Sequence, residues 1–216
     1  MRFEAVLFDC DGVLVDSEPI TNRVLRDMLA EQGWVLQEQE CLQIFVGKMV
    51  RDERARIERE TGKPLTEDWL AWFRERRNQA LRAELKIVNN ALQAVHTVHE
   101  RVDARIACAS GADRPKLELQ LRKVGLYDYF HGRIYSGHEL PRSKPHPDVY
   151  LAAADGLAVP PRRCAVVEDS LTGVAAGLAA GATVFAYVPK GDGAAFRAAG
   201  VAEVFSDMAE LPTILS

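Results

Sequence analysis

The feature that most constrains the fold is an alternation of short apolar runs with longer amphipathic segments. The runs are AVLFDCD from Ala5, ARIACAS from Ala104, GRIYSG from Gly132, CAVVEDS from Cys164 and ATVFAYV from Ala182. They are apolar almost throughout, which is typical of strands buried on both faces of a sheet. Three of the segments between them have the length and pattern of helices: 113–124, 147–156 and 170–180. This order predicts an α/β fold with a doubly wound, Rossmann-like parallel sheet.

A helical stretch interrupts this alternation after the first apolar run. Residues 16–86 are rich in Glu, Arg, Leu and Trp, follow a helical period and are poor in β-branched runs. We therefore expect a small all-helical cap domain at 16–86, inserted after the first strand. The core domain then comprises 1–15 and 87–216.

Two local patterns predict details of that cap. A break at 61–64 contains Gly and Pro, which together stop one helix, and Thr66 can cap the next one. Aromatic residues then follow at i, i+3 and i+4 spacing, which is typical of one buried helix face and much less of a ligand site. The cap core is expected to include Trp69, Trp72 and Phe73.

Composition limits the classes of partner. The formal net charge of −4 provides no polycationic face, so we expect no nucleic-acid partner. The N-terminal apolar stretch is short and soon interrupted by acids, so we expect neither a signal peptide nor a membrane span, and a cytoplasmic location. The four cysteines form no CxxC pair, which favours reduced, buried thiols over a zinc site. A monomer is the expected oligomeric state.

The first candidate for chemistry is the sequence Asp9-Cys10-Asp11-Gly12. On an extended strand end, residues two apart point to the same side, so both carboxylates are expected to project beyond the sheet together. Such a pair predicts either a bound metal or one acid kept protonated. Both fit phosphoryl transfer, with one aspartate attacking phosphorus and the other moving a proton. A bare DxD is more often an acidic turn that caps a helix, so this motif decides little alone.

Two later motifs suggest groups that bind phosphate. Ser110 and Gly111 follow the second apolar run and offer a hydroxyl and backbone amides, although a plain helix N-cap explains Ser110 equally well. Lys144 lies in SKPHPD, where two prolines stiffen the loop, so its ammonium can neutralise phosphoryl oxygens. The alternative is that Lys144 is an ordinary solvated lysine on a surface loop. His146 in the same loop is assigned to structure or surface.

The fourth motif is a pair of adjacent acids, Glu168 and Asp169, at the end of an apolar strand. Acids in that position favour a cation over simple helix capping. The glycines Gly173, Gly177 and Gly181 in the segment that follows let a helix pack closely against the sheet and direct its N-terminus at the site.

Taken in order, DCDGVLVDSE, ASG, SKPHPD and VVEDSLTGVAAGLAAGA resemble the haloacid dehalogenase-like hydrolase superfamily, in its beta-phosphoglucomutase and phosphogluconate phosphatase branch. The resemblance extends from Phe3 to about Val188. It implies a Rossmann-like core with a helical cap. It also implies a magnesium cofactor bound by Glu168, Asp169, the Asp9 side chain and the Asp11 backbone carbonyl.

The same resemblance implies the catalytic roles. Asp9 matches the nucleophile, Asp11 the general acid and base, Ser110 the phosphate-binding hydroxyl, and Lys144 the charge-neutralising lysine. Members that cleave carbon-halogen bonds lack an aspartate at the place of Asp11, because their leaving group needs no proton. A phosphate ester is therefore the expected substrate.

The cap is expected to choose that substrate through Glu18, Gly47 and Lys48. The arginine with which the mutases hold a second phosphate has no clear match, although Lys48 or Arg51 can substitute. The sequence therefore favours a phosphatase for a small phosphorylated metabolite, a sugar or sugar-acid phosphate. A mutase-type isomerase and a non-catalytic phosphate-binding regulator are the alternatives.

Overall fold

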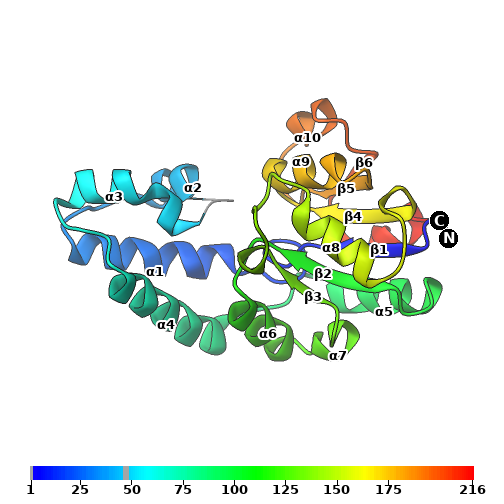
Figure 1. Cartoon of the computed structure of the whole chain (residues 1–216), viewed down its shortest axis with the longest axis horizontal. Coiled ribbons are helices and arrows are strands. Elements are labelled where there is room, and N and C mark those ends of the chain that lie inside the picture. Colours follow the sequence, from blue (N-terminus) through cyan, green and yellow to red (C-terminus); the bar gives the residue numbers. More distant parts are fainter. Residues whose placement is uncertain (1, 46–48) are drawn as a thin grey trace. The chain divides into compact units, whose positions relative to one another are not determined.

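The computed structural model of the protein describes residues 2–45 and 49–216. It divides into two compact units. One runs to Asp16 and resumes at Lys86–Ser216, and the other is Ser17–Leu85. The element order along the chain can be followed in Figure 1.

In the described residues, the first unit contains one sheet of six parallel strands in the order β3-β2-β1-β4-β5-β6. The strands are β1 (Ala5–Phe8), β2 (Ile106–Ser110), β3 (Ile134–Ser136), β4 (Cys164–Glu168), β5 (Thr183–Tyr187) and β6 (Glu203–Phe205). The predicted α/β fold with a helical insert after the first strand is confirmed. The order reverses direction between β1 and β4, and the edge of a parallel sheet at such a reversal is where ligands bind.

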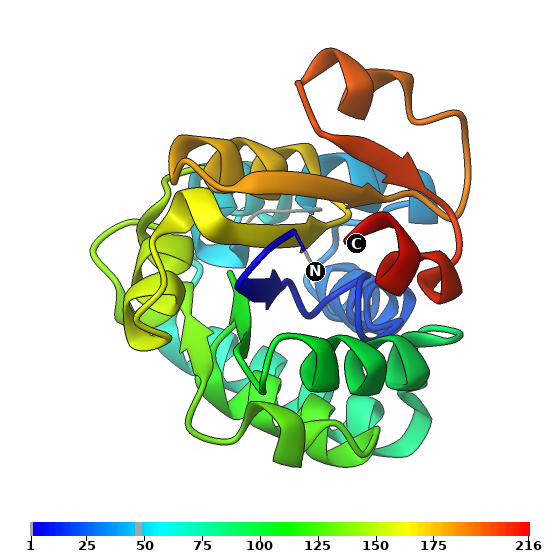
Figure 2. The same ribbon diagram turned by 90° about the vertical axis from the view of Figure 1, so that its right-hand side faces the viewer.

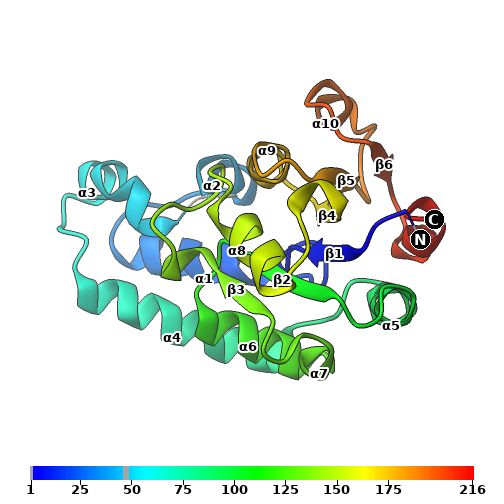
Figure 3. The same cartoon turned by 45° about the vertical axis from the view of Figure 1, so that its right-hand side comes forward.

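Helices cover both faces of this sheet. The first unit contains α5 (Ala91–Arg101), α6 (Arg114–Lys123), α7 (Tyr127–Phe130), α8 (Asp148–Gly156), α9 (Leu171–Ala179), α10 (Ala194–Ala198) and α11 (Leu211–Ile214). Helices α8 and α9 pack on one face, and α5, α6 and α7 lie on the other (Figure 3). The C-terminal helix α11 lies beside the start of the chain (Figure 2), where the Arg2 amide donates to the Leu215 carbonyl at 3.4 Å.

The central strand β1 shows why these runs are apolar throughout. Ala5 and Leu7 face the core layer under α8 and α9, whereas the Phe8 ring meets Phe130 of α7 edge-on at 5.9 Å. Successive side chains of a strand point to opposite faces, so a strand covered on both faces has no polar position. All four of its residues are buried.

The predicted helices match α6, α8 and α9 to within one residue at each end. Strand β6 was not predicted. Its three residues include an exposed glutamate at the sheet edge, so it presents no apolar run.

The second unit is helical in its described residues. It contains α1 (Glu18–Glu31), α2 (Glu38–Phe45), α3 (Arg54–Thr61) and α4 (Glu67–Glu84), with a short 3-10 turn at Val50–Glu53. Gly62 ends α3 in the left-handed region, and the Thr66 hydroxyl accepts from the Trp69 amide at 3.1 Å, so both predicted signals are confirmed.

The prediction for the aromatic cluster is right for two residues and wrong for the third. Trp69 stacks on Phe73 with ring centroids 6.0 Å apart, and both are buried. Trp72 is 55% exposed, and its ring lies under the Arg76 guanidinium at 5.5 Å. A tryptophan at i+3 of a helix can stand at the edge of the apolar stripe, where a cation over its ring replaces core packing.

Two further expectations concern the whole described chain. Its four cysteines are free and buried, as expected. Within residues 2–45 and 49–216, every helix is too short or too polar to cross a bilayer.

We predict that Gly177→Val lowers the free energy of unfolding by about 1 to 3 kcal/mol, because extra volume in a packed layer forces neighbours apart. A Cβ added at this position would lie only 2.8 Å from a methyl of Val184. Ala175→Val, on the exposed face of the same helix, is the control and should change stability by about 0.5 kcal/mol or less. Urea unfolding of both variants measures the difference, and equal stabilities would contradict close packing of α9.

Candidate functional site

The candidate site lies at the carboxyl ends of β1 and β4, where the sheet order reverses. Phe8 pairs with Val167 in register, and the next amide, that of Asp9, donates to the Val167 carbonyl at 3.0 Å. The parallel pairing therefore brings Asp9 next to Glu168, although the two are far apart in the sequence.

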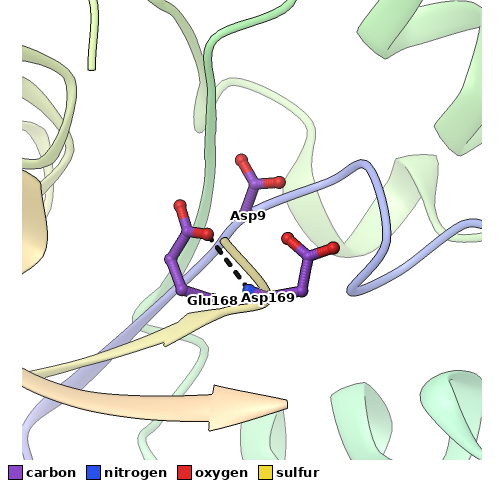
Figure 4. A group of neighbouring side chains, drawn as sticks. All are labelled: Asp9, Glu168 and Asp169. Atoms are coloured by element: carbon purple, nitrogen blue, oxygen red, sulfur yellow. Dashed lines mark hydrogen bonds between the residues drawn. The ribbon is translucent and has the colours of Figure 1, made fainter. Parts of the chain in front are cut away.

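Three carboxylates gather at this edge. One oxygen from each of Asp9, Glu168 and Asp169 lies within 4.8 Å of the others. Figure 4 shows the three groups directed toward the same region, with the Asp169 amide hydrogen-bonded to Glu168 at 3.1 Å. The structure thus brings together two motifs that the sequence only suggested to be neighbours.

Glycine makes room for Asp169. Gly12 has a φ of +79°, and a Cβ added there would lie 1.8 Å from Asp169 Oδ2. A side chain at position 12 would therefore be strained by its backbone and would also displace the carboxylate. The turn that follows Asp9 and the carboxylate that follows β4 share this space.

Lys144 joins the two strand ends. Its side chain is 8% exposed, and Nζ lies 2.6 Å from Asp9 Oδ1 and 2.7 Å from Glu168 Oε1. The ammonium also donates to the Ala109 carbonyl at 3.1 Å and lies 2.9 Å from the Tyr150 hydroxyl. Lys144 is therefore a buried cation at the described site, and the alternative of a solvated lysine is wrong.

Glu168 is fully buried, and both of its oxygens accept hydrogen bonds. Oε1 accepts from Lys144 and from the Tyr150 hydroxyl, the latter at 2.6 Å. Oε2 accepts from the Asp169 and Ser170 amides and from the Ser170 hydroxyl. Gly173, in the first turn of α9, permits this, because a Cβ there would lie 1.7 Å from Oε1.

The cluster of Asp9, Glu168 and Asp169 has more negative charge than the single positive charge of Lys144 can neutralise. Lys144 carries one positive charge and contacts two carboxylates. Burial alone would raise the pKa of Glu168, yet Lys144 and the surrounding donors hold it below its usual value. Burial raises the pKa of Asp9 to about 7, with Glu168 and Asp11 adding to the rise and Lys144 opposing it. Burial lowers the pKa of Lys144, but Asp9 and Glu168 outweigh this and raise it well above its usual value.

The donor set fits a divalent cation. Carboxylate oxygens are the ligands that hard cations such as Mg²⁺ prefer. The raised pKa of Asp9 means that a further positive charge beside it, a proton or a metal ion, is favoured. The cluster of Asp9, Glu168 and Asp169 can therefore hold a metal.

Asp11 lies beyond the end of β1 and is held by side chains of α6. Strand β1 ends at Phe8, and Asp11 lies beyond it, after a bend at Cys10 and before a turn at residues 12–14. Its Oδ2 accepts from Lys116 at 2.8 Å and its Oδ1 from Gln120 at 2.7 Å, both on α6. The Asp11 carboxylate is thus held by two side chains of α6, and its charge also contributes to the rise in the pKa of Asp9. That both carboxylates project together into the space beyond the sheet stays a prediction.

The phosphate-binding candidates lie at the end of β2. Ser110 is buried, and its hydroxyl accepts from the Ala112 amide at 3.3 Å. The N-cap of α6 is Asp113, whose carboxylate accepts from the Lys116 amide, so the alternative of Ser110 as the helix cap is wrong. Gly111 lies between Ser110 and this helix, where a Cβ would be 3.8 Å from the Ser143 hydroxyl.

The remaining candidates are in the helical unit or on the surface. Glu18 begins α1, and Arg51 pairs with Glu67 at 3.8 Å. Gly47 and Lys48 lie outside the described residues. His146 is exposed, as expected.

Three buried polar residues near the site were not predicted: Lys116, Gln120 and Tyr150. Lys116 and Gln120 are four residues apart, on the buried face of α6 beside Leu117 and Leu121. Polar side chains on the apolar stripe of a helix are a readable signal, because a buried polar group needs a partner. Tyr150 has no comparable signal, since a tyrosine in a core helix is unremarkable.

Comparison with known proteins identifies the family of the chain. Residues 3–181 match the family described as haloacid dehalogenase-like hydrolase. The 6-phosphogluconate phosphatase of Escherichia coli is 30% identical over 188 residues, which cover 85% of this chain and 82% of the relative.

Two solved structures are similar over almost the whole chain. A hydrolase of this family from Deinococcus radiodurans, with bound phosphate and sodium, has a TM-score of 0.79 and 36% identity, and covers 99% of this chain and 95% of its own. A structure from Thermotoga maritima described as a beta-phosphoglucomutase has a TM-score of 0.78 and 26% identity, with 98% and 97% covered.

We predict that Gly12→Ala weakens Mg²⁺ binding by about tenfold or more, because the new methyl displaces the Asp169 carboxylate. Gly132→Ala is the matched control. Its φ is +76°, so it carries the same backbone strain, but nothing lies within 4 Å of the added Cβ. Calorimetric titration with Mg²⁺ compares the two variants with the unmodified protein. Equal Mg²⁺ affinity in both variants would contradict a role for Asp169 in metal binding.

Proposed function

Because the chain belongs to the haloacid dehalogenase-like hydrolases, we propose that it is a magnesium-dependent phosphatase that acts through an aspartyl phosphate on Asp9. The observation that carries the proposal is the contact of Lys144 Nζ with Asp9 and Glu168 at the carboxyl ends of β1 and β4. A buried nucleophile held by a fixed cation is suited to a substrate whose reacting group is a phosphoryl anion.

In the first step an Asp9 carboxylate oxygen attacks phosphorus, the ester P–O bond breaks, and the leaving oxygen takes a proton from Asp11. In the second step water attacks the aspartyl phosphate and gives its proton to Asp11. Phosphate then leaves and the Asp9 carboxylate is restored. Lys116 and Gln120 each donate to one oxygen of Asp11 and hold this carboxyl in place for the proton transfer.

Lys144 and the end of β2 bind the phosphoryl group. The Lys144 ammonium neutralises charge on the phosphoryl oxygens, and the Ser110 hydroxyl with the Gly111 amide supplies donors at the end of β2. Asp9, Asp169, Glu168 and the Asp11 carbonyl would hold a magnesium ion, which would supply electrostatic screening between the anionic nucleophile and the anionic ester.

The substrate is a small phosphorylated metabolite, a sugar or sugar-acid phosphate. This is supported by the Escherichia coli relative, which is named for 6-phosphogluconate, and by the related structure with bound phosphate. We propose that residues 16–86 act as the cap, with Glu18, Gly47 and Lys48 choosing the leaving group.

Asp9→Asn is expected to abolish phosphate release from every ester in a panel of sugar and sugar-acid phosphates assayed with magnesium. The amide oxygen is a poor nucleophile, so turnover should fall by about 10⁴-fold or more. Asp155→Asn, at an exposed position of α8, is the control and should keep full activity. Retained turnover in Asp9→Asn would rule out Asp9 as the nucleophile.

Lys144→Met should lower kcat by about 10² to 10³-fold, the usual effect of removing one preorganised charge at a reacting centre. Lys123→Met, on the exposed last turn of α6, provides the comparison. Steady-state kinetics with the best ester from the panel measure both. An unchanged kcat would show that the Lys144 ammonium plays no part in phosphoryl transfer.

The product formed from a hexose 1-phosphate distinguishes a phosphatase from a mutase. Incubation with a hexose 1-phosphate and its bisphosphate yields free phosphate if the enzyme is a phosphatase. A 6-phosphate product without net phosphate release would instead favour the isomerase. Tight magnesium-dependent binding without turnover of any ester would favour the regulatory alternative.

A further inference from the structure

Tyr150 is the one fully buried tyrosine in the described chain, and it stands where the apolar core meets the charged site. It belongs to the first turn of α8, and its ring lies in the core layer with Leu7, Ala109 and Val166. A phenylalanine would fill the same volume. The hydroxyl is what distinguishes the residue, and a buried hydroxyl is costly unless it is hydrogen-bonded.

The hydroxyl is bonded on both sides. It donates to Glu168 Oε1 at 2.6 Å and lies 2.9 Å from Lys144 Nζ, whose ammonium can only donate. Nζ also lies 4.7 Å from the centroid of the Tyr150 ring. Tyr150 therefore contacts Lys144 through both its hydroxyl oxygen and its ring, and it donates its hydroxyl proton to Glu168.

The Lys144 ammonium has fewer protons than it has hydrogen-bond acceptors around it. An ammonium has three protons. Lys144 Nζ has four acceptors within 3.1 Å, which are Asp9 Oδ1, the Ala109 carbonyl, the Tyr150 hydroxyl and Glu168 Oε1. The lysine cannot serve all of them at once. Tyr150 supplies a second donor to Glu168 Oε1. This oxygen therefore keeps a hydrogen bond when Lys144 donates its proton to another acceptor.

We propose that Tyr150 is a positioning residue that shares Glu168 with Lys144 and so leaves a Lys144 proton available to the transferring phosphoryl group. This inference rests on the proposed function and deepens it. Without the hydroxyl, Glu168 Oε1 depends on Lys144 alone, and the ammonium is drawn toward β4 and away from Asp9. The phosphoryl group then loses charge neutralisation during transfer, whereas binding of the ester in the ground state is little affected.

Tyr150→Phe tests the proposal, because it removes the hydroxyl and keeps the ring. With p-nitrophenyl phosphate and magnesium we expect kcat to fall by about tenfold or more, and KM to stay within about twofold. Tyr135→Phe is the matched control. Tyr135 is partly buried and packs against the same core layer, and its variant should keep both constants within about twofold.

A second readout does not depend on activity. The Lys144 ammonium is observed by ¹⁵N-detected NMR of lysine side chains and assigned by its absence from Lys144→Met. Tyr150→Phe should shift this signal or broaden it beyond detection, whereas Tyr135→Phe should leave it unchanged. Thermal unfolding establishes that each variant is folded. If Tyr150→Phe does not fold, Tyr150→Met replaces it, since methionine fills irregular core space without a hydroxyl.

The outcomes separate the two proposals. A fall in kcat together with a changed Lys144 signal supports the positioning role. An unchanged kcat overturns it, and so does an unchanged Lys144 signal. If the unmodified protein releases no phosphate from any ester, the proposed function fails. The Lys144 signal then still decides whether the Tyr150 hydroxyl positions the ammonium.

Discussion

The structure of the site depends on one ammonium group shared by two buried carboxylates. Lys144 reaches Asp9 at the end of β1 and Glu168 at the end of β4, with Nζ 2.6 and 2.7 Å from the two oxygens. Removing one member of a buried ion pair leaves an uncompensated charge, which is strongly unfavourable. The two strand ends are therefore tied together electrostatically as well as by the sheet. One positive charge also leaves an excess of negative charge, which is why a cation is favoured beside Asp9.

The backbone prepares the space for these charges. The parallel register of β1 and β4 sets the separation of the acids, and two glycines keep the neighbouring volume open. Gly12 clears room for the Asp169 carboxylate and Gly173 for Glu168. Ser170 then caps α9 by accepting from the Gly173 amide, while its hydroxyl donates to Glu168. The arrangement of the acids is thus determined by main-chain geometry and by residues that have no part in the chemistry.

Much of this was predictable from the sequence, for a physical reason. A strand buried on both faces is apolar along its whole length, so β1 and β4 and the acids that end them, Asp9 and Glu168, are visible without coordinates. The partners of Asp11 could not be predicted, because Lys116 and Gln120 lie far along the chain on α6. Trp72 was misplaced because helical spacing alone does not fix the edge of the buried stripe. Gln120 pairs with Asp11 across 109 positions of sequence, a separation that no local pattern encodes.

The helical unit leaves and rejoins the sheet domain at adjacent points. The Asp16 amide donates to the Lys86 carbonyl at 3.0 Å, the Val88 amide donates to the Leu14 carbonyl at 3.0 Å, and Val15 bridges Ile87 in antiparallel fashion. A segment whose two ends are already clasped adds only slowly growing loop-closure entropy as it lengthens. Because these contacts already hold the two ends of the insert together, an insert of different length or composition can be accommodated there while the strands at the candidate site keep their register.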